Sequence, residues 1–142
     1  MTPHQINLIK TSWQLAAANA ETVGQLFYGR LFQIAPQVKP MFSRISVTDQ
    51  SKKLLATLSF VISKLDKLDE IIDEVAKLAR RHVNYGVSPE HYTAVGSALL
   101  WTLETGLAEH WNDELKEAWT TCYTILSGAM ISAAEYPTMD AA

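Results

Sequence analysis

The chain has 142 residues, a formal net charge of −3 from 12 basic and 15 acidic residues, and a hydrophobic content of 48%. This length fits a single domain over 1–142, and the apolar content is too high for a disordered chain. The charges are mixed along the chain and form no basic stripe, which argues against nucleic-acid binding.

The first two predicted helices lie close together in the sequence. Thr2, Pro3 and Gln5 form a capping-box pattern, in which Thr2 caps a helix and the proline occupies its first turn. The second helix is expected over 21–35, because Pro36 lacks an amide proton and disfavours helix in the residue before it. Both segments repeat apolar residues at helical spacing: Ile6, Ile9, Trp13 and Ala17 in the first, and Val23, Phe27, Leu31 and Ile34 in the second.

A short turn bounded by prolines and a polar connection over 43–48 lead to the third predicted helix. Thr48 or Asp49 is expected to cap this helix. A further helical segment starts at Asp69 and ends at Gly86, a residue type that is common just after a helix. The residues expected to face inward are Leu54, Leu58, Val61 and Leu65 in the third helix, and Ile72, Val75, Leu78 and Ala79 in the next.

Two long helices complete the chain. Ser88 and Pro89 form a helix start, with serine as cap and proline in the first turn, and the last helix is expected from about Asp113 to Pro137. Strand signals are weak. The fold class is therefore all-α, with six or seven helices in a bundle or a globin-like arrangement. Three glycines within the predicted helices are expected to allow helices to approach closely: Gly24, Gly96 and Gly128.

The cysteine content and the hydropathy favour a cytoplasmic protein. Cys122 is the only cysteine, so no disulfide can form within the chain, and its apolar neighbours predict a buried thiol. No stretch of about 18 apolar residues is present, so we expect no membrane insertion. The N-terminus carries polar residues in place of an apolar run, so we expect no signal peptide.

His82 is the candidate functional residue. It follows Leu78 by four residues and Val75 by seven, so it extends an inward-facing apolar row. A neutral imidazole on such a face is either a hydrogen-bonded core residue or a ligand to a group bound in the core, and the spacing alone leaves both interpretations open. The other three histidines are expected at exposed positions or helix ends: His4, His91 and His110.

Other kinds of site find no support in the sequence. One cysteine and four scattered histidines do not supply a zinc site, and the Glu-x-x-His pairs of two-metal carboxylate bundles do not occur. The sequence also has no nucleophile elbow, phosphate-binding loop or dinucleotide-binding fingerprint.

Several segments follow one another in a recognisable order over nearly the whole chain. They are FYGRLF at 27–32, VKPMF at 38–42, QSKKL at 50–54, ARRH at 79–82, HYTAVG at 91–96, and AW at 118–119 followed by Tyr123. This ordered set resembles the globin family, especially single-domain bacterial haemoglobins, the haem domain of flavohaemoglobins and neuroglobin-like globins. The resemblance implies a globin fold of six to eight helices enclosing a pocket for haem b (iron protoporphyrin IX).

The resemblance also assigns roles to residues on both sides of the iron. His82 would be the proximal ligand, with its other ring nitrogen donating to a backbone carbonyl. On the distal side, Tyr28 and Gln50 would donate hydrogen bonds to dioxygen, which carries partial negative charge when bound. The alternative interpretation of Gln50 is an ordinary surface residue near a helix start.

The remaining expected contacts surround the haem. Phe42 would pack on the porphyrin face; the alternative interpretation is an ordinary core residue. Lys53 and Arg81 are candidates to meet the propionates, but exposed charges of this kind are more often simply solvated. The other residues expected at the haem are Leu54 above the iron, Val87 at the haem edge and Tyr92 beside the proximal histidine.

Two departures from related globins bear on reactivity. Gln50 stands where myoglobin-like globins and neuroglobin have a distal histidine, so no histidine can bind the iron from that position, although Tyr28 could approach ferric iron at high pH. Flavohaemoglobins set a tyrosine and a glutamate beside the proximal histidine, and Tyr92 matches the tyrosine. The glutamate position falls on Ala134, and Glu135 is turned away by about 100° of helix, so we expect a weaker electronic push on the iron.

The sequence leaves three functions open. The leading hypothesis is reversible binding of dioxygen, for storage, delivery or sensing, with nitric oxide and carbon monoxide as further possible ligands. The second is nitric oxide dioxygenase activity, which would need an external reductase because the sequence shows no flavin or nicotinamide domain. The third is a helical interaction module without a cofactor, against which His82 argues.

Overall fold

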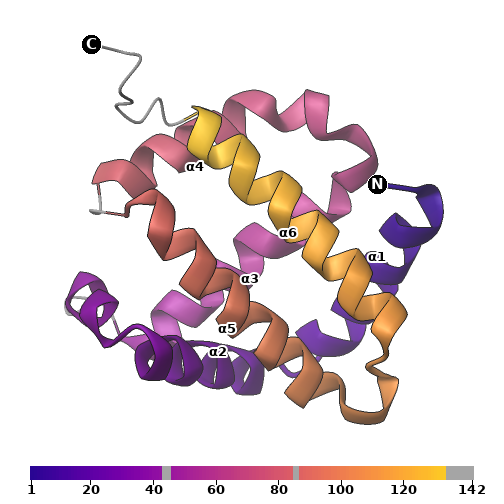
Figure 1. Cartoon of the computed structure of the whole chain (residues 1–142), viewed down its shortest axis with the longest axis horizontal. Coiled ribbons are helices and arrows are strands. Elements are labelled where there is room, and N and C mark those ends of the chain that lie inside the picture. The colour runs from indigo at the N-terminus through magenta and orange to yellow at the C-terminus, as the bar shows by residue number, and fades with distance from the viewer. Residues whose placement is uncertain (43–45, 85–86, 134–142) are drawn as a thin grey trace.

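A computed structural model of the chain describes residues 1–42, 46–84 and 87–133, and every regular element in these ranges is a helix (Figure 1). The all-α fold class is therefore confirmed. The α-helices of the described residues are α1 (Pro3–Ala17), α2 (Ala20–Ile34), α3 (Val47–Ser63), α4 (Ile72–Asn84), α5 (Pro89–Leu107) and α6 (Asp113–Ala133). Three 3-10 segments connect them: η1 (Pro36–Phe42), η2 (Leu65–Ile71) and η3 (Ala108–His110).

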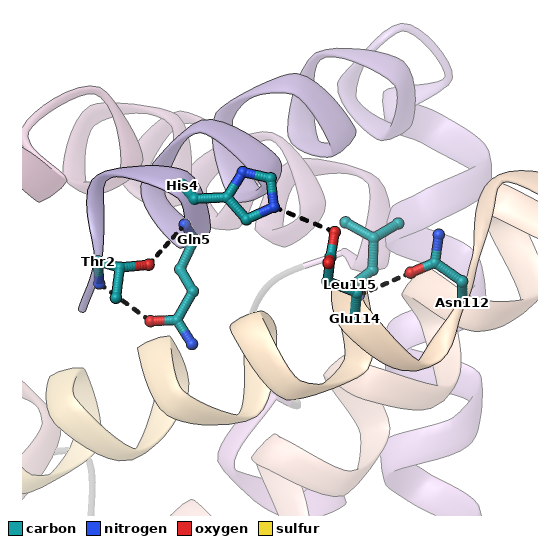
Figure 2. Close-up of polar contacts among 6 residues, drawn as sticks. All are labelled: Thr2, His4, Gln5, Asn112, Glu114 and Leu115. Atoms are coloured by element: carbon teal, nitrogen blue, oxygen red, sulfur yellow. Dashed lines mark hydrogen bonds and ion pairs between the residues drawn. The ribbon is translucent and has the colours of Figure 1, made fainter.

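The N-termini of α1 and α6 lie side by side (Figure 2). The predicted capping box is confirmed: the Gln5 amide donates to Thr2 Oγ1 at 3.1 Å, and the Thr2 amide donates to Gln5 Oε1 at 3.0 Å. His4 Nε2 lies 3.2 Å from Glu114 Oε1 in the first turn of α6, and the Asn112 side chain caps that helix. First-turn side chains therefore satisfy backbone amides that no helical partner can reach.

The core forms where α6 packs against α1, α4 and α5, and where α2 packs against α3 and α5. At the contact between α1 and α6, Trp119 Nε1 donates to Ser12 Oγ at 2.9 Å, and the Trp13 and Trp119 ring centroids are 6.1 Å apart. Cys122 is buried on the same helix, as predicted, and burial raises the pKa of its thiol to about 12. The largest fully buried side chains are Trp119, Ile9, Leu31, Leu103, Thr102 and Cys122.

Two of the three predicted close-approach glycines are confirmed. A Cβ atom on Gly24 would overlap with Cβ of Ser51, so a side chain there would push α2 away from α3. A Cβ atom on Gly96 would lie 2.6 Å from the Tyr123 ring. The prediction was wrong for Gly128, because among the described residues no atom outside the backbone of its own helix lies within 4 Å of the place that a Cβ atom would take.

The third predicted helix starts earlier than expected. Ser46, and neither Thr48 nor Asp49, is its N-cap: the Asp49 amide donates to Ser46 Oγ at 3.1 Å. The inward face also differs, since Leu55 and Ile62 are buried, whereas Leu54 and Leu58 are only half-buried beside the core. The predicted burial of Val61 and Leu65 is confirmed.

The segment before His82 differs from the prediction at its start. A 3-10 stretch, η2, precedes α4, and Lys67 within it has non-helical angles of φ −140° and ψ 43°. This kink shifts the helical phase, so Ile71 is buried and Ile72 is 66% exposed. The start predicted at Asp69 was therefore wrong, because α4 begins at Ile72.

Parts of the predictions concern residues that the structure does not describe. These are the helix end at Gly86, the end of the last helix at Pro137, and residues 43–45 of the polar connection. Within the described ranges, no helix has the length and apolar character needed to cross a membrane.

Candidate functional site

His82 lies near the end of α4 with its ring oriented by the preceding turn. Its Nδ1 atom is 2.8 Å from the carbonyl oxygen of Leu78, a distance that fits a hydrogen bond. A carbonyl can only accept, so Nδ1 carries the proton in the neutral ring and the lone pair lies on Nε2. A metal-binding imidazole has this tautomer when it binds through Nε2.

The surroundings of His82 favour the neutral imidazole. Burial lowers the pKa of His82 below its usual value, and the positive charge of Arg81 acts in the same direction, whereas the bond to Leu78 opposes them. The Val87 amide donates to the His82 carbonyl at 3.0 Å, which fixes the backbone after the ring. At neutral pH the His82 imidazole is therefore uncharged.

Tyr92, in the first turn of α5, lies beside His82. The two ring centroids are 6.5 Å apart and the planes differ by 22°, and Tyr92 is 8% exposed. This pairing brings the end of α4 and the start of α5 together. The neighbouring His91, expected to be exposed, is half-buried, because its Nδ1 accepts the Ser88 amide at 3.0 Å and so caps α5.

Tyr28 and Gln50 come together from α2 and α3. Tyr28 is 3% exposed, and burial raises the pKa of its hydroxyl to about 12, although a hydrogen-bonding contact with the Gln50 side chain works against this rise. Gln50 is half-buried in the first turn of α3. The close approach of Ser51 to Gly24 holds the two helices together at this level. The buried, protonated hydroxyl of Tyr28 and the side-chain amide of Gln50 therefore lie next to each other.

An aromatic cluster joins Tyr28 to the corner that follows α2. The ring centroid of Phe42 lies 5.4 Å from that of Tyr28 and 5.7 Å from that of Phe32. Phe27 contacts Tyr28 edge-on at 4.9 Å. These spacings are those of favourable aromatic pairs. Phe42 is half-buried, so one part of its ring is left outside the packed core.

A cavity of about 330 Å³ lies between α3 and α4. Leu78 and Arg81 line it from the His82 side, and Val61 and Phe60 line it from α3. Phe60 is 44% exposed, although it is a large apolar side chain. Sequence reasoning missed Phe60, although it had predicted that its neighbours in the cavity wall, Val61 and Leu78, face inward.

The remaining predicted haem contacts lie around these residues, but they do not all contact one another. Leu54 and Val87 are half-buried, while Lys53 and Arg81 are exposed, in keeping with the ordinary solvated interpretation of such charges. The structure thus brings together His82 with Tyr92, and separately Tyr28 with Gln50 and Phe42. Ala134 and Glu135, on which the predicted electronic push depends, lie outside the described residues.

Among proteins of known sequence, the chain is similar to flavohemoproteins and neuroglobins. A flavohemoprotein of Rhodopirellula baltica is 32% identical over 128 residues, which is 89% of this chain and 31% of that protein, so the chain spans about a third of its length. Neuroglobin-1 of Oncorhynchus mykiss is 26% identical, over 92% of this chain and 90% of that protein.

Solved structures agree with these relatives. A bacterial globin from Campylobacter jejuni superposes with a TM-score of 0.82 at 30% identity, covering 94% of this chain and 96% of that one. A hexacoordinated heme protein from an anhydrobiotic tardigrade has the same fold, with a TM-score of 0.83 at 14% identity over 94% of this chain and 95% of that one. The family model described as Globin matches residues 25–130, and homologues in this family bind haem. The chain belongs to the globin family.

Proposed function

We propose that this chain holds one haem b through His82 and reversibly binds dioxygen on the side of Tyr28 and Gln50. The observation that carries the proposal is the 2.8 Å contact between His82 Nδ1 and the Leu78 carbonyl. It fixes the tautomer and direction of a half-buried neutral imidazole, which is what an axial iron ligand requires.

The residues present fit a haem. A single axial imidazole suits an iron whose four equatorial ligands come from the macrocycle. Apolar side chains from α3 and α4 line a pocket that reaches Leu78 and Arg81, the residues one turn before and next to His82, and Phe60, which is 44% exposed, also lines it. Arg81 lines the same cavity and supplies a cation suited to a propionate.

The distal residues supply two hydrogen-bond donors to a small polar ligand. When bound, the haem supplies an iron that takes a diatomic gas reversibly. Because the pKa of Tyr28 is about 12, its hydroxyl keeps its proton throughout the physiological range and acts as a donor. The Gln50 amide offers a second donor whose state does not depend on pH. Phe42 and Leu54 add apolar surface that limits access of water.

Removing the Tyr28 hydroxyl tests this assignment. In Tyr28→Phe, dioxygen release should be faster by roughly tenfold to a hundredfold, since a hydrogen bond to a charged acceptor contributes about 1.5–3 kcal/mol. Stopped-flow kinetics of the oxygenated protein measures the rate. Carbon monoxide, which is a weaker acceptor, serves as the control ligand and should leave at a nearly unchanged rate. Equal dioxygen release rates in variant and wild type would contradict the role of Tyr28.

The similarity to flavohemoproteins supports a second candidate function, nitric oxide dioxygenase activity. The same two distal donors would serve it, and each turnover consumes an electron that a reductase, which we propose to be an external partner, delivers. We place the protein in the cytoplasm, where reductants are abundant and the single buried Cys122 stays a thiol. Repeated consumption of nitric oxide with a cellular reductase supports this function, whereas one stoichiometric reaction without cycling argues against it.

A further inference from the structure

A groove of about 290 Å³ runs along the outer surface between α5 and α6, and none of the described residues lines both this groove and the cavity between α3 and α4. On each helix the lining residues recur every three or four positions, so they form one row: Thr93, Ser97 and Leu100 on α5, and Thr120, Thr124 and Ser127 on α6. Figure 1 shows α6 crossing the near face of the molecule with no other described helix in front of it. The α5–α6 groove is therefore open to solvent.

The two helices beside this groove carry the longest uncharged stretches of the sequence. No Asp, Glu, Lys or Arg occurs in residues 91–103 or 118–134, although such residues make up 19% of the chain. Apart from Pro89, every residue that lines the groove falls within these two stretches. The cores of protein interfaces are depleted of charged residues relative to the rest of the surface. Because the chain has a net charge of −3, this uncharged face is also where two copies would meet with the least repulsion.

The hydroxyl groups on the α6 side of the groove already donate hydrogen bonds within their own helix. Thr120 Oγ1 donates to the Lys116 carbonyl at 2.7 Å, and Thr124 Oγ1 donates to the Thr120 carbonyl at 2.8 Å. Ser127 Oγ donates to the Thr124 carbonyl at 3.3 Å. A hydroxyl that keeps such a bond loses water at a lower cost than one left without a partner. The α6 wall of the groove can therefore be covered by protein without leaving these donors unsatisfied.

Gly128 lies on the same outer side of α6, four residues after Thr124. Glycine within a helix lowers stability relative to alanine. At Gly24 the missing side chain lets α3 approach closely, but among the described residues no atom outside the backbone of its own helix lies within 4 Å of the Cβ position at Gly128. A helix from outside this chain, lying across α6, would make use of the space at Gly128.

We propose that the α5–α6 groove is the contact surface of a homodimer, in which α6 of each copy lies across the groove of the other. A twofold contact needs the groove and the ridge that fills it on one surface. Here α6 provides both, because its outer side also carries Gly128 and the exposed, apolar Ile125. This proposal does not depend on the haem-binding function.

The size of the uncharged face fits a weak dimer. Its α6 part, residues 118–133, is about 24 Å long, and two neighbouring helices are about 20 Å wide, so each copy offers roughly 500 Å². Two copies would bury about 1,000 Å², which is close to the lower limit for a specific interface. We therefore expect association that depends on protein concentration.

Sedimentation equilibrium of the purified chain between about 1 μM and 1 mM is the test. The wild type should shift from its monomer mass of 15.8 kDa towards twice that mass as concentration rises. Thr124→Glu would bring like charges together across the twofold axis, so this variant should stay monomeric throughout. Thr11→Glu is the matched control, because it makes the same change at an exposed position of α1 outside the groove, and it should dimerise like the wild type.

Ser97→Glu repeats the test from the α5 wall, in case Thr124→Glu impairs folding. It should also stay monomeric while keeping the far-ultraviolet circular dichroism of the wild type. A wild type that stays monomeric at the highest concentration would overturn the proposal. A dimer that persists in both groove variants, or one that is lost equally in Thr11→Glu, would overturn it as well. Haem binding is measured separately from the Soret band, so its failure would not be mistaken for any of these results.

Discussion

Tyr28 is a residue whose protonation depends on its place in the fold. Burial raises the pKa of its hydroxyl to about 12 from an ordinary value of 10.0. Sequence alone could suggest Tyr28 and His82 as a pair, because the motifs around them have a fixed order. The resemblance also implied that the imidazole donates to a backbone carbonyl and that Tyr28 and Gln50 share one side, but the structure was needed to identify that carbonyl as Leu78 and to show the direct contact between Tyr28 and Gln50.

The raised pKa of Tyr28 predicts a specific loss of stability in alkali. Between pH 10 and about 12 the unfolded chain releases the Tyr28 proton and the folded chain retains it, so stability that is fully present below pH 10 falls as pH rises through this window. In Tyr28→Phe this part of the alkaline loss should disappear. Chemical denaturation of wild type and variant at pH 8 and near pH 11 measures it. A difference spectrum showing Tyr28 ionised near pH 10 would contradict the prediction.

At the scale of the helices, the placement of Tyr28 beside Gln50 depends on the close packing of α2 against α3. Gly24 faces Ser51 so closely that no side chain fits, and Ser51 follows Gln50 directly. The glycine pattern made this contact predictable. The phase of α4 was not predictable, because Lys67 breaks the helical geometry of η2 and an apolar period cannot show where a 3-10 stretch replaces an α-helix.

Gly24→Ala should therefore destabilise the protein by about 1–3 kcal/mol, because overpacking forces the two helices apart. It should also speed dioxygen release by displacing Gln50. Gly29→Ala is the control on the same helix: nothing lies within 4 Å of its side-chain position, so it should be neutral or stabilising by about 0.5–1 kcal/mol. Urea denaturation compares the two variants, and equal free energies of unfolding would show that the contact does not limit packing.

At the scale of the whole molecule, the candidate site residues form two groups on different helices, and a cavity lies near the group that contains His82. His82 and Tyr92 belong to α4 and α5, whereas Tyr28 and Gln50 belong to α2 and α3. The order of motifs predicted this division, and the helical spacing of apolar residues predicted the all-α fold. The cavity between α3 and α4, with Phe60 at its edge, required the structure, because its two walls are distant in sequence.

The most direct test of this account is the visible spectrum of the protein titrated with haem, in wild type and in His82→Ala. The wild type should take up one equivalent and show a Soret band, and His82→Ala should lose or severely weaken that band. His4→Ala is the control, because His4 lies at the surface beside Glu114, and it should behave as wild type. A wild type that takes up no haem, or a His82→Ala variant with an unaltered Soret band, would contradict the assignment of His82 as the iron ligand.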